Sequence, residues 1–160
     1  MSIVLNGTTG ITAPEVLPTS VPCTLVETTG TQTALANGVY TKINLDVSTI
    51  DTDSFFDSST NYRFQPTISG YYYITSSVRL SGITDQTTVV NALYKNGSNY
   101  AFLALEAASG TTNTQAVGSS LVYLNGSTDY LEVWAQHEDG GTAAVSTNGT
   151  YFIAYLVSKA

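Results

Sequence analysis

The sequence predicts an all-β fold, a β-sandwich or barrel, on the strength of three observations. Segments of alternating apolar and polar residues recur along the chain, turn residues separate them, and helix patterns are nearly absent. Alternation with a period of two is typical of a strand with one buried face. Many short strands joined by tight turns favour a sandwich or a barrel, and 160 residues are enough for one such domain.

The N-terminal segment differs from the rest of the chain. Residues 1–24 contain three of the four prolines, and their apolar residues are isolated. Such a segment cannot bury a core of its own, so we expect an extended arm or linker followed by a globular domain at 25–160. The strand-like apolar positions of this arm are Ile3, Val4, Leu5 and Ile11.

The globular part begins with a clear alternating segment. In residues 39–47 one face would carry Val39, Thr41, Ile43, Leu45 and Val47, which predicts one half-buried strand. Further strands are expected at residues 62–64, 70–80, 88–95, 117–125, 129–136 and 150–158. Residues 99–109 contain good helix formers, but the segment is short and lies among strands, so a strand is expected there as well.

Tight turns are indicated between these strands. Asn-Gly occurs five times, at Asn6, Asn37, Asn96, Asn125 and Asn148, and most of these pairs lie beside an expected strand. Asn and Gly both tolerate the positive φ angles that two-residue hairpin turns require. The pairs therefore support an antiparallel arrangement.

Two of the strands carry apolar residues on both faces. In "GYYYITSSVRL", Tyr72, Ile74, Ser76, Val78 and Leu80 share a core-like face, whereas Tyr71 and Tyr73 lie on the other. In the last strand, Phe152, Ala154 and Leu156 oppose Tyr151, Ile153, Tyr155 and Val157. Because one face of each sheet of a sandwich normally meets water, a second apolar face indicates contact with another subunit. The predicted contact residues of a homo-oligomer are Tyr71, Tyr73, Tyr151, Ile153 and Tyr155. A tyrosine platform for a sugar would instead need exposed rings, which the sequence does not show.

Charge and cysteine content exclude several classes of function. Only 11% of the residues are charged, and the five basic residues are scattered in a chain of net charge −7. No basic footprint for nucleic acid or for an anionic membrane exists. No apolar run approaches the ~18 residues of a transmembrane helix. The start of the chain does not resemble a signal peptide, and the single cysteine, Cys23, allows no intrachain disulfide, so synthesis in a cytoplasm is expected.

The sequence contains few residues that could form a catalytic site. His137 is the only histidine, it lies in "WAQHEDGG" before a glycine-rich loop, and no Gly-x-Ser-x-Gly nucleophile motif accompanies it. We therefore expect an exposed loop histidine and no enzyme. With Glu138 and Asp139 it provides too few ligands of the right type for a transition metal.

One acidic loop could in principle bind calcium. "STIDTDSFFDSS" contains Asp51, Asp53 and Asp57, but the twelfth position counted from Asp51 is Tyr62 and not the glutamate of an EF-hand. A polar loop with its two phenylalanines turned into the body is expected instead. No cofactor and no metal ion are predicted.

The order of the motifs resembles a known superfamily. "FFDSSTNYRFQPTISGYYYITSSVRL", "VVNALYKNGSNY", "GSSLVYLNGSTDYLEVWA" and "NGTYFIAYLVSKA" are similar, in order and spacing, to segments of complement 1q globular heads and tumour necrosis factor proteins. The resemblance covers roughly residues 38–160. This sequence departs from the family pattern in three places: a Gly-Asp turn has become Gly126-Ser127-Thr128-Asp129, Ala154 replaces a usual glycine, and the collagen stalk of the complement relatives is absent. The receptor-binding residues of the family are therefore not assigned to this chain.

This resemblance implies a ten-stranded jelly roll that forms a compact trimer around a threefold axis. A second resemblance concerns the arm: "SIVLNGTTGITAP" is similar to a short segment of bacteriophage tail-fibre and other virion proteins. Together they predict a non-enzymatic, homotrimeric virion knob of the capsid decoration, cement or head-fibre type. Residues 1–24 would bind a major capsid or tail protein through Ile3, Val4, Leu5 and Ile11.

The sequence leaves two alternatives open. One is a tail-fibre or spike tip that binds a host-surface glycan or receptor. The other is a bacterial carbohydrate-binding module of the same fold.

Overall fold

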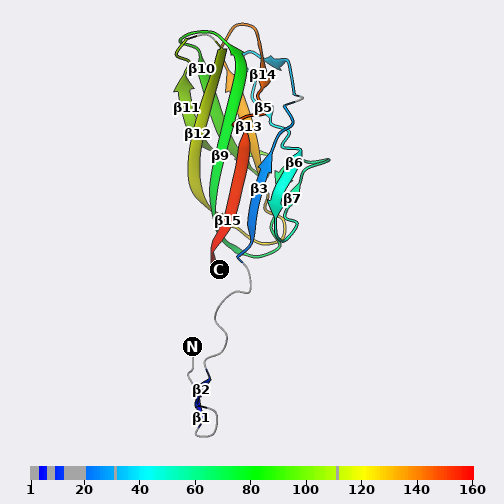
Figure 1. The fold of residues 1–160 in the computed structure, drawn as a ribbon, viewed down its shortest axis with the longest axis vertical. Coiled ribbons are helices and arrows are strands. Elements are labelled where there is room, and N and C mark those ends of the chain that lie inside the picture. Colours follow the sequence, from blue (N-terminus) through cyan, green and yellow to red (C-terminus); the bar gives the residue numbers. More distant parts are fainter. Residues whose placement is uncertain (1–3, 7–9, 13–20, 31, 111) are drawn as a thin grey trace.

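The computed structural model describes residues 4–6, 10–12, 21–30, 32–110 and 112–160, and these form strands and turns without a helix among them (Figure 1). Most of the strands lie in two sheets that face each other as a sandwich. The strands are β1 (Val4–Asn6), β2 (Gly10–Thr12), β3 (Cys23–Glu27), β4 (Leu35–Ala36), β5 (Thr41–Lys42), β6 (Val47–Asp51), β7 (Phe56–Asp57), β8 (Arg63–Phe64), β9 (Gly70–Ile83), β10 (Thr88–Lys95), β11 (Ser98–Ala107), β12 (Thr112–Leu124), β13 (Leu131–His137), β14 (Thr142–Val145) and β15 (Tyr151–Lys159).

Each sheet is named here after its longest central strand. In the β9 sheet, β12 pairs along one edge of β9, while β14 and β15 share the other edge and continue to β4 and to β3 and β6. In the β10 sheet the order is β11-β10-β13-β8-β7, with β5 also paired to β13. All pairings are antiparallel. The sheets contain seven and six strands rather than ten in all, because two-residue segments such as β4 and β5 count separately.

The core lies between the sheets and confirms the face assignment made from the sequence. Tyr72, Ile74, Val78 and Leu80 of β9 are fully buried, as is Phe152 of β15. Burial first, and then the charge of Asp53, raises the pKa of Tyr72 to about 12. Its hydroxyl donates to the carbonyl of Ile68 at 2.8 Å, which satisfies the polar end of a buried ring.

Most of the predicted strands are confirmed, including the one over residues 99–109, which forms β11. The prediction of one continuous strand at 39–47 is wrong. Ile43 and Leu45 are buried as the alternation requires, but Val39 and Val47 are exposed. The segment splits because its amides find different partners: Ile43 N–H donates to Val133 O, and Asn44 N–H donates to the Gln32 side chain.

Two local features close the sandwich. The turn between β10 and β11 is Asn96-Gly97, with φ angles of 54° and 77°, as expected for a two-residue hairpin of type I′. Along the neighbouring edge, Gly118 of β12 passes so close to β11 that a Cβ atom there would clash with the Leu103 carbonyl. Only glycine allows the two sheets to approach in this way.

A buried asparagine joins the two sheets across the core. Asn91 of β10 donates from its side-chain amide to the carbonyls of Ser76 and Ala116, and accepts from the Ser76 hydroxyl. It is completely buried with both ends of its amide bonded, which favours one registration of the sheets over others.

No helix among the described residues is long and apolar enough to cross a membrane.

Candidate functional site

The outward face of the β9 sheet is apolar at one end and is formed by cross-strand rows of side chains. Tyr73 lies between Leu121 of β12 and Tyr155 of β15 in the register, and the rings of Tyr73 and Tyr155 are 5.4 Å apart. One row nearer the start of β9, Tyr71 lies opposite Tyr123, with ring centroids 5.5 Å apart. These rows form the aromatic half of the face.

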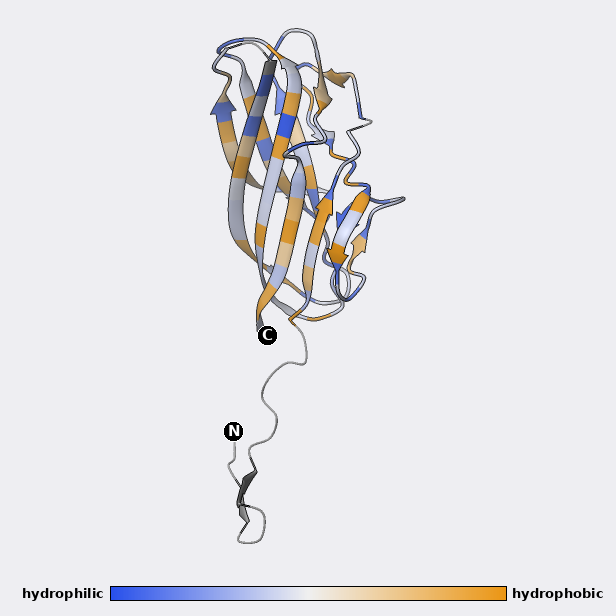
Figure 2. Cartoon of the chain, viewed as in Figure 1, coloured by the Kyte–Doolittle hydropathy of each residue, from blue (hydrophilic) through white to orange (hydrophobic). Residues whose placement is uncertain are grey.

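The other half of this face is aliphatic. Ile153 of β15 pairs with Leu25 of β3, which in turn pairs with Ile50 of β6. Tyr151 pairs with Glu27 in the next row. Figure 2 shows the apolar residues that recur along β15 and β3 in the front sheet. The five residues predicted as subunit contacts thus lie on one continuous surface, and their role in assembly stays a prediction.

Strand β12 adds residues that the sequence analysis did not include. Val117, Leu121 and Tyr123 point to the same side as Tyr71 and Tyr73, and Leu121 is 53% exposed. Their signal was available, because Val117, Leu121 and Tyr123 alternate with the buried Ala116, Val122 and Leu124. The same period-of-two argument that separated the tyrosines of β9 would have found them.

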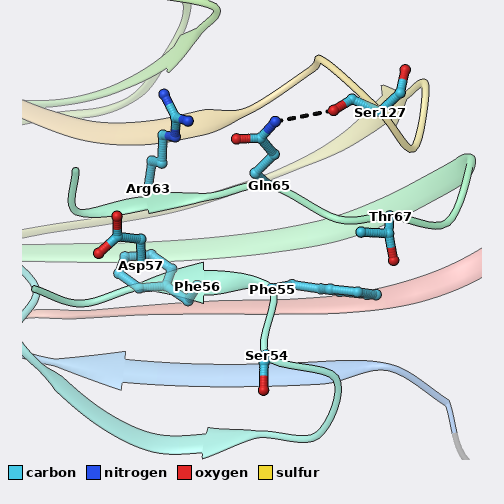
Figure 3. Close-up of a pocket in the computed structure, with 8 residues that line it drawn as sticks. All are labelled: Ser54, Phe55, Phe56, Asp57, Arg63, Gln65, Thr67 and Ser127. Carbon is cyan, nitrogen blue, oxygen red and sulfur yellow. Dashed lines mark hydrogen bonds between the residues drawn. The ribbon is translucent and has the colours of Figure 1, made fainter. Parts of the chain in front are cut away.

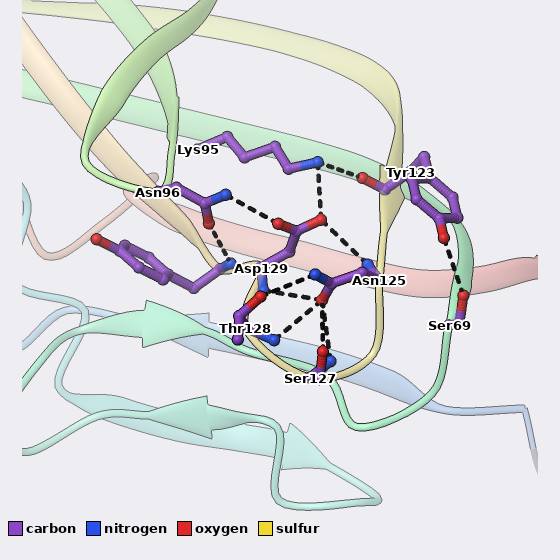
Figure 4. A network of polar contacts seen from close by, with 9 residues as sticks. Ser69, Lys95, Asn96, Tyr123, Asn125, Ser127, Thr128 and Asp129 are labelled. Atoms are coloured by element: carbon purple, nitrogen blue, oxygen red, sulfur yellow. Dashed lines mark hydrogen bonds and ion pairs between the residues drawn. The ribbon is translucent and has the colours of Figure 1, made fainter.

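A polar network supports the aromatic end of the face (Figure 4). Lys95 Nζ lies 2.9 Å from Asp129 Oδ2 and donates to the Tyr123 carbonyl at 2.8 Å. Asn96 donates to Asp129 Oδ1 and accepts from the Tyr130 amide. The network ties the β10–β11 hairpin to the turn between β12 and β13, and so holds Tyr123 in place.

The turn itself is capped by Asn125. Its side-chain oxygen accepts hydrogen bonds from the amides of Ser127, Thr128 and Asp129, each at 3.0 Å. Burial raises the pKa of Asp129, but the bonds from Asn96, Lys95 and the Asn125 amide, together with the Lys95 charge, outweigh it and lower the net pKa below its ordinary value. Asp129 is therefore a structural anion.

Few charges interrupt this face. Glu27 accepts a hydrogen bond from Thr49, and Arg79, at the polar end, donates to the Asn148 carbonyl. Interface cores are depleted of charge and enriched in tyrosine, whereas a surface facing water normally carries charged residues. The chemistry of the face suits burial against protein.

Three of the four predicted attachment residues lie among the residues that the structure describes. Val4 and Leu5 belong to β1 and Ile11 belongs to β2, and the two strands pair with Leu5 opposite Ile11. Ile3 lies outside the described residues. The chain enters the sandwich at the end where the C-terminus lies (Figure 1), and there the Leu156 amide donates to the Pro22 carbonyl.

The prediction of an exposed loop histidine is wrong. His137 is the last residue of β13 and is completely buried. Its Nε2 lies 2.9 Å from the Leu35 carbonyl, and the Asp139 amide donates to its Nδ1. Since Nδ1 accepts, Nε2 carries the proton and donates to Leu35. The ring fastens the start of β4 to the end of β13, a contact between residues far apart in the sequence.

The acidic loop is held by its own backbone. Asp51 accepts hydrogen bonds from the amides of Phe55 and Phe56 and from the Thr24 hydroxyl. The Asp57 carboxylate accepts from the amides of residues 59, 60 and 61, and these bonds lower its pKa well below the usual range. Within the described ranges, no three His, Cys, Asp or Glu side chains come close enough to hold a metal ion.

A shallow pocket of about 290 Å³ lies beside this loop (Figure 3). Its lining is Ser54, Phe55, Phe56, Asp57, Arg63, Gln65, Thr67 and Ser127. The strongest polar groups are already engaged: Asp57 by its turn, Gln65 by the Ser127 carbonyl at 3.0 Å, and the Arg63 guanidinium by the Tyr130 ring at 4.6 Å. The pocket therefore resembles a structured corner of the surface more than a site with groups directed at a ligand.

Comparison with known proteins places the fold. No family model and no curated protein sequence matches the chain. Among solved structures, the globular domain of zebrafish complement 1qA protein superposes with a TM-score of 0.63 at 14% identity, over 88% of this chain and 100% of that one. Murine APRIL matches with a TM-score of 0.61 at 12% identity, over 86% of this chain and 100% of that one. Eiger TNF from S. frugiperda matches with a TM-score of 0.58 at 9% identity, over 88% of this chain and 94% of that one. The predicted all-β jelly-roll fold is confirmed.

Proposed function

We propose that the chain is a non-enzymatic structural protein of a bacteriophage particle, in which the jelly roll forms a homotrimeric knob and the N-terminal segment attaches it. The observation that carries the self-association is the apolar, nearly uncharged face of the β9 sheet. Tyr71, Tyr123 and Tyr155 are each 41–46% exposed in the single chain. A contiguous surface of this kind is unfavourable in water unless a partner covers it.

The shape of the face suits a cyclic assembly. A threefold contact joins two different areas of surface, because each copy meets its neighbours head to tail. The face provides two such areas: the aromatic rows on β9, β12 and β15, and the aliphatic row of Leu25 and Ile50 on β3 and β6. The jelly-roll fold supports the same arrangement, since the superfamily resemblance implies a trimer.

The attachment role rests on the arm. Its similarity to segments of bacteriophage virion proteins is the main support, and the pairing of β1 with β2 gives the arm two strands that another protein could extend by edge pairing. Major capsid or tail proteins are the partners we propose.

Two experiments test this function. Light scattering of the full chain should give a trimer, and a stable monomer at micromolar concentration would reject the assembly. Particles purified from cells infected with the phage that encodes the chain should contain it, and deletion of residues 2–20 should leave a soluble trimer that no longer joins them. Incorporation of the deleted form would reject the attachment role.

The location of the protein on the particle would distinguish a capsid knob from a tail-fibre or spike tip. A capsid knob would appear as trimeric density on the shell, whereas a tail-fibre or spike tip would appear at the end of the tail.

A further inference from the structure

A second aromatic surface lies on the outward face of the β10 sheet, on the other side of the sandwich. It consists of Tyr40, Tyr94, Phe102 and Trp134, named here the outer aromatic cluster. The rings of Tyr94 and Trp134 stack with centroids 4.4 Å apart and an interplanar angle of 16°. Tyr40 stacks on Phe102 at 6.1 Å and contacts Tyr94 at 6.3 Å. Four separate chain segments thus contribute to one row of rings.

Cross-strand packing explains only part of this surface. Aromatic pairs on neighbouring strands stabilise a sheet, and the stacked Tyr94 and Trp134 are both half-buried. Strand β11 departs from this pattern, because Phe102 is 62% exposed, Leu105 66% and Tyr100 47%. Large apolar side chains that stay in water on an ordered strand indicate a binding surface.

Two of the charges beside the cluster, Lys42 and Glu132, are paired with each other. Lys42 Nζ lies 3.1 Å from Glu132 Oε1, and Trp134 Nε1 donates to Glu132 Oε2 at 3.1 Å. Lys42 also donates to the Asn61 carbonyl. With these two groups paired, Glu138 still contributes a negative charge near Tyr40: burial first, and then Tyr94 and Glu138, raise the pKa of the Tyr40 hydroxyl. An anionic occupant is therefore disfavoured, and a neutral one fits the surface better.

The strongly exposed part of the surface, on β11, is small compared with a protein interface. With ~200 Å² for an aromatic side chain, Tyr100, Phe102 and Leu105 together expose roughly 300 Å². A stable protein interface buries about 800 Å² on each partner. An extended oligosaccharide matches both the smaller area and the row of rings.

We propose that the outer aromatic cluster, with Tyr100 and Leu105, binds an uncharged carbohydrate. The C–H face of a pyranose ring carries partial positive charge and stacks on the negative face of an aromatic ring. Phe102 and Tyr100 supply the stacking faces. The hydroxyl of Tyr40 and the side-chain amide of Asn99, which lies opposite Tyr94 in the register, supply hydrogen bonds to sugar hydroxyls. Gln136, whose side-chain nitrogen already donates to the Gly38 carbonyl at 2.8 Å, adds its side-chain oxygen as an acceptor. The inference goes beyond the proposed function and does not depend on the particle.

The single tryptophan makes the site measurable in the full chain. Trp134 is the only tryptophan, so its fluorescence reports on the cluster directly. The probes are neutral oligosaccharides (cellohexaose, maltohexaose, chitohexaose and a mannan), with heparin as an anionic comparison. We expect saturable binding of at least one neutral probe and a change in Trp134 fluorescence.

Two substitutions at one position separate ring stacking from general apolar contact. Phe102→Leu keeps an apolar side chain but removes the ring, and should weaken binding about tenfold, which corresponds to ~1.4 kcal/mol. Phe102→Tyr keeps the ring and should bind as the unchanged chain does. Absence of saturable binding across the neutral probes, or undiminished binding by Phe102→Leu, would overturn the proposal. A lower assembly mass of Phe102→Leu would also overturn it, because the surface would then be a subunit contact.

Discussion

The sharpest test of the subunit-contact surface is the substitution Tyr155→Ala. Tyr155 is 41% exposed in the single chain, which is about 80 Å² of a side chain of ~200 Å². Covering this area in a trimer contributes about 2 kcal/mol per copy at ~25 cal/mol per Å². Three copies contribute about 6 kcal/mol, so the substitution should raise the trimer dissociation constant by about four orders of magnitude.

Sedimentation equilibrium over nanomolar to micromolar concentrations measures this change. The unchanged chain should behave as a species of about 51 kDa, three times the 16.9 kDa of one chain, and Tyr155→Ala should shift toward 16.9 kDa. The matched control is Tyr100→Ala, which removes a tyrosine of similar exposure (47%) from the β10 sheet and should leave the mass unchanged. The reasoning is refuted if Tyr155→Ala remains a trimer at nanomolar concentration, or if both variants dissociate alike.

Three further predictions concern the stability of the fold. Gly118→Ala should destabilise the fold by roughly 1–3 kcal/mol or more, because the new methyl group meets the backbone of β11. Thermal unfolding measures this change. An unchanged melting temperature would contradict the close approach of β12 to β11. His137→Leu should cost about 1–3 kcal/mol by leaving the Leu35 carbonyl and the Asp139 amide without their partner, and urea unfolding that matches the unchanged chain would speak against it. The pKa of Asp129 is lowered from 3.8 in the folded chain, so its stabilising contribution is present above that pH and is lost as the pH falls through the folded pKa. Asp129→Asn should therefore be less stable at neutral pH and lose less stability in acid, which urea unfolding at both conditions checks; equal acid sensitivity of the two chains would count against the network.

The two-faced strands show what the sequence could predict about the site. Alternation in β9 and β15 is local, so the inward positions of Tyr72 and Phe152 and the outward positions of Tyr71 and Tyr155 follow from the pattern alone. The same rule applies to β12, and Leu121 could have been found with it. The order in which strands pair could not be predicted in this way, because alternation along one strand does not show which other strand lies beside it.

His137 and the segment at 39–47 show where local reasoning failed. The hydrogen-bond partner of the buried His137 is the Leu35 carbonyl, 102 residues away in the sequence. The residues around His137 therefore could not reveal its burial. The amide of Asn44 is taken by the Gln32 side chain rather than by a neighbouring strand, so a perfect alternation did not become one strand. In both cases a tertiary hydrogen bond overrides the local signal. The outer aromatic cluster could not be predicted from local patterns either, since its four rings come from four separate segments.

The two exposed aromatic surfaces are best understood together. The face of the β9 sheet is broad, nearly uncharged and divided into an aromatic and an aliphatic area, as a head-to-tail contact between copies requires. The outer aromatic cluster is smaller and carries its own neutralised ion pair. If a trimer buries the first, the second still faces outward, because the two lie on opposite sides of the sandwich. A knob of this kind would use one sheet to bind itself and the other to bind a ligand. The two tyrosine substitutions separate these roles: Tyr155→Ala should lower the mass and Tyr100→Ala should weaken sugar binding at constant mass.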